Sequence, residues 1–179
     1  SVYKLIEFHN IRWFDTNMVV SLTCAKKWLQ EEPCLISYSD IFYESSAVYS
    51  LINSHAQLAI TYDPNWLNVW TKRFGDPLLD AETFLINSSN QIIEIGNKPI
   101  SVEEIQGQYM GLLRITPESW EQISSVIAKF PRNIRDKMSM TRLLQNLIQY
   151  KKLPVIGVPY NGKWGEIDSQ SDLEKFDTI

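Results

Sequence analysis

Two carboxylates, Asp40 and Asp168, could bind a metal ion, and a third, Glu166, could add charge beside that ion or bind a cationic group of a substrate. Asp40 follows the apolar run Cys34–Tyr38, which has the pattern of a buried strand. Glu166 and Asp168 are two residues apart, so on an extended segment both side chains would point to the same face. Carboxylate oxygens are ligands that Mg²⁺ prefers in proteins. A carboxylate after a strand is more commonly a turn residue or helix cap, and Glu166 could equally be a solvated edge residue.

Four aromatic residues could contribute to a site for an organic cation: Trp66, Trp70, Tyr109 and Trp164. Aromatic rings beside carboxylates bind quaternary ammonium groups by cation–π attraction. Trp66 and Trp70 are four residues apart and would share one helix face, where both could be ordinary core residues. The core interpretation is favoured for Trp66, and substrate binding by Trp66, Tyr109 and Trp164 is kept as a hypothesis.

The elements that must position these residues alternate between strands and helices. Cys34–Tyr38 predicts a strand in the middle of a parallel sheet, residues 46–54 predict a helix, and Leu58–Tyr62 predicts a second buried strand. This order is a crossover unit and predicts an α/β fold. Because ligands bind at the carboxyl ends of strands in open α/β sheets, Asp40 would face a ligand crevice.

The rest of the chain predicts further elements around this unit. Asn17 can cap a helix whose apolar positions recur to Leu29. The other predicted elements are a strand at Tyr3–Phe8, a hairpin of Glu82–Asn87 with Gln91–Ile95, a strand at Gly107–Ile115, helices at 116–129 and 139–151, a strand at Val155–Val158, and a last helix from Ser169. Residues 1–179 are therefore expected to form one domain, an α/β three-layer sandwich with a mixed, mainly parallel sheet.

The composition argues against several classes of protein. The chain has 179 residues, of which 44% are hydrophobic, enough for one core. A net charge of −4 and scattered Lys and Arg argue against nucleic acid as a partner. No apolar run approaches the roughly 20 residues that span a bilayer, no signal-peptide pattern is present, and Cys24 and Cys34 lack the spacing of a zinc site. We expect a soluble, cytoplasmic protein.

Three parts of the sequence together carry a family resemblance. They are DTNMVVSL at 15–22 with the strand that ends at Asp40, IEIGNKP at 93–99 with QGQYMGL at 106–112, and GKWGEID at 162–168 with Asp172-Leu173. In this order and spacing they resemble the nucleotidyltransferase family that includes phosphocholine cytidylyltransferases and sugar-phosphate nucleotidyltransferases. The likeness covers nearly the whole chain and implies the nucleotide-diphospho-sugar transferase fold.

The resemblance assigns roles to individual residues. It implies that Asp40 and Asp168 face each other across a catalytic Mg²⁺. Lys98 matches a lysine that contacts the acceptor phosphate in sugar-phosphate relatives, although an exposed turn lysine commonly has no such role. Trp66 matches an aromatic residue at the choline-binding position of phosphocholine cytidylyltransferases, where Glu166 and Asp168 would supply negative charge.

One departure from the family shapes the expected function. Members begin with a strand and a glycine-rich loop that holds the triphosphate, and no such loop occurs among the seven glycines of this chain. We expect a fragment that lacks the N-terminal strands, that is inactive alone, and whose sheet edge homo-oligomerisation could cover. The expected reaction of the intact enzyme is transfer of CMP from CTP to a small phosphorylated or phosphonylated amino alcohol such as phosphocholine, with release of pyrophosphate. The alternatives are a sugar 1-phosphate acceptor and a non-catalytic binding or regulatory module.

Overall fold

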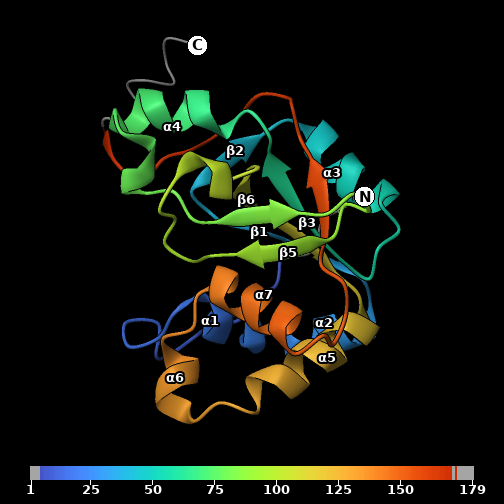
Figure 1. The fold of residues 1–179 in the computed structure, drawn as a ribbon. Helices are drawn as coiled ribbons and strands as arrows, with labels where there is room; N and C mark the ends of the chain where they lie inside the picture. Colours follow the sequence, from blue (N-terminus) through green and yellow to red (C-terminus); the bar gives the residue numbers. More distant parts are fainter. Residues whose placement is uncertain (1–4, 171, 173–179) are drawn as a thin grey trace.

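The structure is a computed structural model that describes residues 5–170 and residue 172. Its central sheet contains β1 (Cys34–Ser37), β3 (Leu58–Asp63), β6 (Gln108–Ile115) and β7 (Ile156–Pro159). The strand order is β1-β6-β3-β7 (Figure 1). β7 pairs parallel with β3, whereas β6 runs antiparallel to both β3 and β1. β1, β3 and β7 therefore share one direction, which confirms the predicted mixed sheet.

Helices cover both faces of this sheet. One layer contains α1 (Met18–Cys24), α2 (Lys26–Glu31), α5 (Pro117–Ile127) and α7 (Met140–Gln149), with the short α6 (Arg132–Asp136) against α1. The other layer contains α3 (Ser45–Asn53) and α4 (Trp66–Phe74). Figure 1 shows the first group below the strands and α3 and α4 above them. The predicted α/β sandwich is confirmed.

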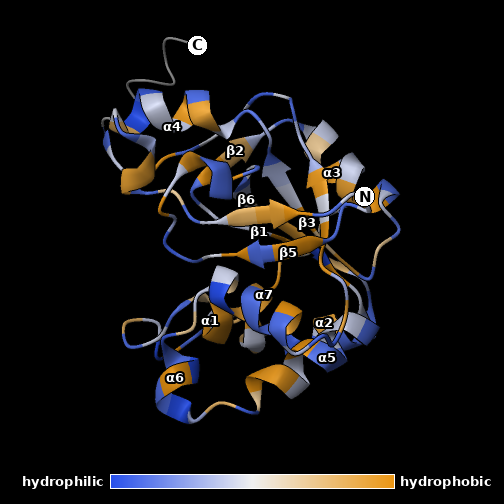
Figure 2. Ribbon diagram, in the orientation of Figure 1, coloured by the Kyte–Doolittle hydropathy of each residue, from blue (hydrophilic) through white to orange (hydrophobic). Residues whose placement is uncertain are grey.

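The burial of β3 explains why the sheet needs helices on both sides. Leu58 and Ile60 belong to the core formed with α1, α2, α5 and α7, whereas Ala59 belongs to the core formed with α3 and α4. All residues of β3 are buried. In Figure 2, α4 and α7 each carry apolar and polar residues, as expected for helices with one buried face.

Two short ladders flank the central sheet. β4 (Phe84–Ile86) pairs antiparallel with β5 (Ile92–Ile95), which confirms the predicted hairpin. β2 (Ile41–Tyr43), which the sequence did not predict, pairs antiparallel with β8 (Trp164–Glu166). The described 3-10 helices are η1 (Pro77–Leu79) and η2 (Val102–Glu104).

The N-terminal part differs from its prediction in two places. Residues 5–8 of the predicted strand Tyr3–Phe8 form no strand. Leu5 is 86% exposed, so its side chain is not packed in the core as it would be in a buried strand. The helix predicted to reach Leu29 is divided at Ala25 into α1 and α2. There the Ala25 amide bonds to the Leu22 carbonyl three residues back, at 3.1 Å, which tightens the last turn of α1.

The position of β1 also differs from its prediction. It was expected in the middle of the sheet, but it lies at one edge of the described sheet, and Leu35 is 40% exposed. Its apolar sequence reflects one partly buried face, where Cys34 and Ile36 pack against the core formed with α1, α2, α5 and α7. Most of the helix predicted from Ser169 lies outside the described residues. Among residues 5–170 and 172, every helix is too short or too polar to span a bilayer.

Candidate functional site

The ladder of β2 and β8 brings two distant parts of the chain together. Ile41 pairs with Glu166, and the Ile167 amide donates a hydrogen bond to the Asp40 carbonyl at 2.8 Å. Asp40 therefore precedes β2 at the same end of the ladder where Asp168 follows β8. The backbone hydrogen bonds of this ladder fix the separation of the carboxylates.

Asp40, Glu166 and Asp168 form one acidic cluster. Each offers a carboxylate oxygen, and these oxygens all lie within 4.8 Å of one another. Asp40 and Asp168 are exposed, and Glu166 is partly buried. Burial raises the pKa of the Glu166 carboxyl, a hydrogen bond from Arg73 lowers it, and the charge of Asp168 raises it. The structure thus brings Asp40 and Asp168 close enough to share an ion and adds Glu166 beside them.

The donor set fits Mg²⁺. It consists of carboxylate oxygens, with no thiol or imidazole among the described members of the cluster, and hard oxygen ligands are those that Mg²⁺ prefers. Because Mg²⁺ to oxygen distances are about 2.1 Å, two oxygens on one ion are at most about 4.2 Å apart. Small side-chain rotations would close the observed spacing to that value. Metal binding by Asp40 and Asp168 stays a prediction that this geometry favours.

Arg73 already neutralises part of the cluster. Its guanidinium, on the last turn of α4, forms ion pairs with Glu166 at 3.0 Å and Asp168 at 2.9 Å, and a third with Asp172 at 3.3 Å. The Arg73 side chain is only 3% exposed and packs over the Phe74 ring. A metal ion on the same carboxylates would therefore share them with a buried arginine.

Two hollows open beside the cluster and share Met18, Tyr38 and Met140 in their walls. The first, which we call the Glu166 cavity, has a volume of about 270 Å³. Its other lining residues are Trp70, Asp80, Glu82, Gln108, Tyr109, Ser139, Thr141 and Glu166. The second, the Asp40 cavity, has a volume of about 340 Å³. Its other lining residues are Ser21, Leu22, Ile36, Ser37, Ser39 and Asp40.

Gly111 lets the wall between the two hollows form. Its φ is +82°, and a Cβ added there would lie 2.8 Å from the Tyr38 ring. The Tyr38 amide also donates to the Gly111 carbonyl at 3.0 Å. Tyr38 therefore packs directly on the β6 backbone, with its ring edge-to-face against Tyr109. A larger residue at position 111 would displace the wall that both cavities share.

The predicted aromatic residues divide between the cavity and the core. Tyr109 lines the Glu166 cavity. Trp66 is 4% exposed, donates its indole N–H to the Ile105 carbonyl at 3.1 Å, and does not line either cavity. Trp164 is 9% exposed and donates to the buried Asp63 carboxylate at 3.0 Å. The structure places Trp66 and Trp164 in the core that supports the cavity, where Trp70 forms part of the wall.

Lys98 lies near the cavity but does not line it. Its ammonium donates to the carbonyls of Leu78 and Leu79, the second at 3.1 Å, and so fastens the turn at Pro99 to η1. Burial raises the pKa of the adjacent Asp80, and the charges of Arg73 and Lys98 lower it. Contact between Lys98 and an acceptor phosphate stays a prediction.

The sequence has a substantial match to a protein of known activity. It is 39% identical to the CTP:phosphoglutamine cytidylyltransferase of Campylobacter jejuni subsp. jejuni serotype O:2, in an alignment over 181 residues that covers 93% of this chain and 70% of that protein. The chain belongs to the nucleotidyltransferase family. No model of a protein family matches the chain.

Solved structures agree with this nucleotidyltransferase membership at the level of the fold. The inositol-1-phosphate CTP transferase from T. maritima superposes with a TM-score of 0.69 at 18% identity, over 91% of this chain. A candidate glucose-1-phosphate thymidylyltransferase from Bacillus anthracis superposes with a TM-score of 0.61 at 15% identity, over 88% of this chain. The chain spans 60% and 58% of the lengths of these two structures.

Several residues of this candidate site were not predicted from the sequence. Arg73 has the sequence signature of a basic residue in the last turn of a helix, and its partners lie more than 90 residues further along the chain. Asp80 and Glu82 lie just before β4 with one residue between them. On an extended segment this spacing would place both carboxylates on the same face, and it was the available sign of a shared site. Only the folded chain shows that both face the Glu166 cavity.

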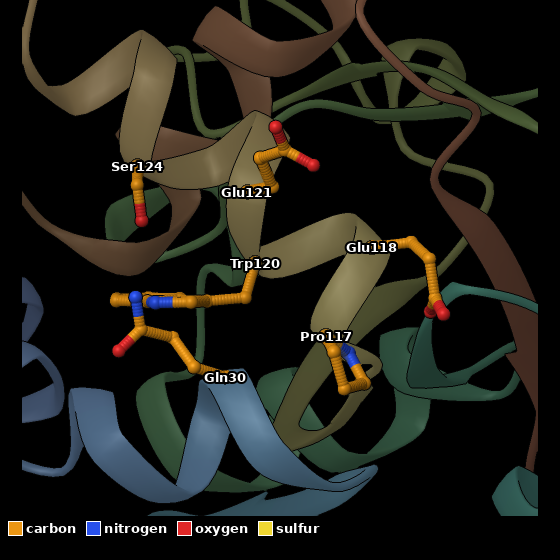
Figure 3. Close-up of a pocket in the computed structure, with 6 residues that line it drawn as sticks. All are labelled: Gln30, Pro117, Glu118, Trp120, Glu121 and Ser124. Atoms are coloured by element: carbon orange, nitrogen blue, oxygen red, sulfur yellow. The ribbon is translucent and has the colours of Figure 1, made fainter.

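A larger hollow lies elsewhere, between α2 and α5. Its volume is about 510 Å³, and Figure 3 labels its lining residues: Gln30, Pro117, Glu118, Trp120, Glu121 and Ser124. The Gln30 and Trp120 side chains overlap in this view, whereas Glu118 and Glu121 point in different directions (Figure 3). Its acidic groups thus do not converge on one point, unlike those of Asp40, Glu166 and Asp168.

Proposed function

We propose that this chain forms the metal- and acceptor-binding part of a cytidylyltransferase that transfers CMP from CTP to phosphoglutamine, with release of pyrophosphate. The observation that carries the proposal is the convergence of Asp40, Glu166 and Asp168, of which Glu166 lines one cavity and Asp40 lines the other. The identity to a CTP:phosphoglutamine cytidylyltransferase supports the choice of nucleotide and acceptor. The phosphocholine acceptor inferred from the sequence gives way to this choice.

The proposed reaction joins two phosphates. An oxygen of the acceptor phosphate attacks the α-phosphorus of CTP, and the bond from that phosphorus to the bridging oxygen of the β-phosphate breaks. The electron pair leaves with pyrophosphate, and the new bond forms the diphosphate link of the product. An ionised phosphate is already a nucleophile, so no side chain has to remove a proton from it.

The acidic cluster would contribute by binding and positioning. Asp40, Glu166 and Asp168 would hold Mg²⁺, which when bound neutralises the crowded phosphate charges. Arg73 holds Glu166 and Asp168 in place from the α4 side, at 3.0 and 2.9 Å. Tyr38 and Met140 line both cavities, so groups bound in the two hollows would be neighbours on either side of these side chains.

The burial of Trp66 argues against a choline cage built on this residue. A quaternary ammonium needs an open aromatic face, and Trp66 is 4% exposed with its ring packed near Trp70. The Glu166 cavity instead offers amide, hydroxyl and carboxylate groups, from Gln108, Ser139, Thr141 and the acidic residues. The cavity also has aromatic walls, from Tyr38, Trp70 and Tyr109, but its many hydrogen-bonding groups suit an acceptor that can form hydrogen bonds better than a trimethylammonium group, which has no N–H to donate.

Pyrophosphate release by the complete protein tests the proposal. CTP with phosphoglutamine and Mg²⁺ should give pyrophosphate, and phosphocholine or glucose 1-phosphate in place of phosphoglutamine should give much less. The variant Asp40→Asn should lose the reaction, whereas Glu94→Gln should keep it because Glu94 lies outside the cluster and both cavities. Absence of pyrophosphate with phosphoglutamine, or full activity of Asp40→Asn, would refute the proposal.

A further inference from the structure

Two carboxylates in the Glu166 cavity, Asp80 and Glu82, form no ion pair with a described residue, although the charges of Arg73 and Lys98 lie close enough to Asp80 to lower its pKa. No described residue donates a hydrogen bond to the Asp80 carboxylate or forms an ion pair with it. Glu82 accepts one hydrogen bond, from the Thr141 hydroxyl at 3.2 Å, and no described residue donates to its second oxygen. The third carboxylate of the cavity, Glu166, differs because Arg73 pairs with it. Asp80 and Glu82 therefore leave negative charge in the cavity.

Buried polar atoms in the same cavity also lack partners. Trp70 is 4% exposed, and its indole N–H has no hydrogen-bond acceptor among the described residues. The buried Tyr109 hydroxyl likewise lacks a hydrogen-bond partner of good geometry among the described residues, although the Tyr38 hydroxyl lies close enough to interact with it. Both residues line the Glu166 cavity together with Asp80 and Glu82. An unpaired buried polar group costs free energy, so its occurrence at a cavity wall is typical of a place that a ligand completes.

We infer that the Glu166 cavity binds a primary ammonium group of the acceptor, held by the carboxylates of Glu82 and Asp80. This inference rests on the proposed function and goes beyond it by assigning residues to acceptor recognition. Glutamine phosphorylated through its side-chain amide keeps an α-ammonium group and an α-carboxylate. The ammonium would donate to Glu82 and Asp80, and the unpartnered N–H and O–H groups of Trp70 and Tyr109 would be available to the carboxylate.

The cavity chemistry favours an organic ammonium over a second metal ion. Trp70, Tyr38 and Tyr109 supply aromatic walls, which attract organic cations and contribute no metal ligand. The separate cluster of Asp40, Glu166 and Asp168 is the described group of carboxylates with the spacing of a metal site, and it does not include Asp80 or Glu82. A compact ammonium with three N–H donors matches two carboxylates that carry free oxygens.

Calorimetric binding to the complete protein can test the inference with two compounds. One is glutamine phosphorylated on its side-chain amide, and the other is the same molecule without the α-amino group. The wild-type protein should bind the first about ten- to hundredfold more tightly, as expected for a hydrogen-bonded charge pair. Glu82→Gln should reduce this preference to below about threefold, Asp80→Asn should reduce it partly, and both variants should keep the wild-type affinity for the deaminated compound.

Glu94→Gln is the matched control, because Glu94 is also a partly buried glutamate of the hairpin region but lies outside the cavity. It should keep the full preference, and thermal unfolding should show that all variants fold. Equal binding of the two compounds by the wild type, or an unchanged preference in Glu82→Gln, would overturn the inference while phosphoglutamine remains a substrate. If phosphoglutamine neither binds nor supports pyrophosphate release, the proposed function fails and the inference fails with it.

Discussion

Replacing Arg73 with Gln removes the buried cation that joins α4 to the end of β8. The arginine side chain is 3% exposed and pairs with Glu166, Asp168 and Asp172. Of these carboxylates only Asp172 is nearly inaccessible, with 8% of its side chain exposed, so the variant leaves one buried carboxylate without its cation and held by hydrogen bonds from Ser169 and the Asp168 amide. Breaking such a pair costs about 3 kcal/mol, and for a chain of this size that corresponds to a decrease of about 6 to 12 °C in Tm.

Thermal unfolding followed by circular dichroism would measure this loss. Arg132→Gln is the control, because Arg132 is 71% exposed and its 3.6 Å pair with Asp136 should contribute under about 1 kcal/mol. Mg²⁺ should stabilise Arg73→Gln more than the wild type, since the ion would then bind Glu166 and Asp168 without sharing them with a guanidinium. A Tm of Arg73→Gln within about 2 °C of the wild type would refute the reasoning.

The remaining predictions concern the cluster, the core and the shared wall. Asp40→Asn in the complete protein should lower kcat at least about a hundredfold, since metal ligation contributes several kcal/mol, and steady-state kinetics over a Mg²⁺ titration would check it. Trp66→Ala should cost about 3 to 5 kcal/mol in denaturant unfolding and leave the acceptor KM unchanged, whereas a raised KM without a stability loss would restore a binding role. Gly111→Ala should cost about 1 to 3 kcal/mol in thermal unfolding, because of its φ of +82° and the 2.8 Å approach to Tyr38.

The order of strands and helices was largely predictable because it depends on local patterns. The apolar runs of β1 and β3 and the caps at Asn17 and Thr116 are visible within a few residues of sequence. Asp40 and Asp168 could be selected because each follows a strand. Their separation could not be derived from local pattern, because it depends on β2, a three-residue strand whose partner β8 lies near the other end of the chain.

The residues of the cavity wall were less predictable for the same reason. Trp66 and Trp70 have identical side chains on one face of α4, and both are buried. Only their neighbours separate them: Ile105 accepts the Trp66 N–H, whereas Trp70 packs against Trp164 and borders the Glu166 cavity. Helical spacing shows that two residues share a face, but the elements packed on that face decide which of them meets a ligand.

Glu82 gives a pH-dependent prediction that separates a binding role from a structural one. Burial raises the pKa of its carboxyl above the ordinary 4.5, the Thr141 hydrogen bond lowers it, and the charge of Asp80 raises it further. Because the folded state binds this proton more tightly than the unfolded state, the contribution of Glu82 to stability is fully present below pH 4.5 and is lost as pH rises through the raised pKa. Glu82→Gln keeps the shape and an oxygen for Thr141 without the charge.

The Tm of Glu82→Gln minus that of the wild type should therefore be near zero at a pH of about 4.5 and positive at a pH of about 7.5. Glu94→Gln, measured in parallel, should show no such increase. If Glu82→Gln is instead less stable than the wild type at the higher pH, the ionised carboxylate serves to hold the first turn of α7 through Thr141. If Glu82→Gln is more stable than the wild type at neutral pH but no longer prefers the compound that carries the α-amino group, then the ionised Glu82 carboxylate lowers stability and is needed for binding.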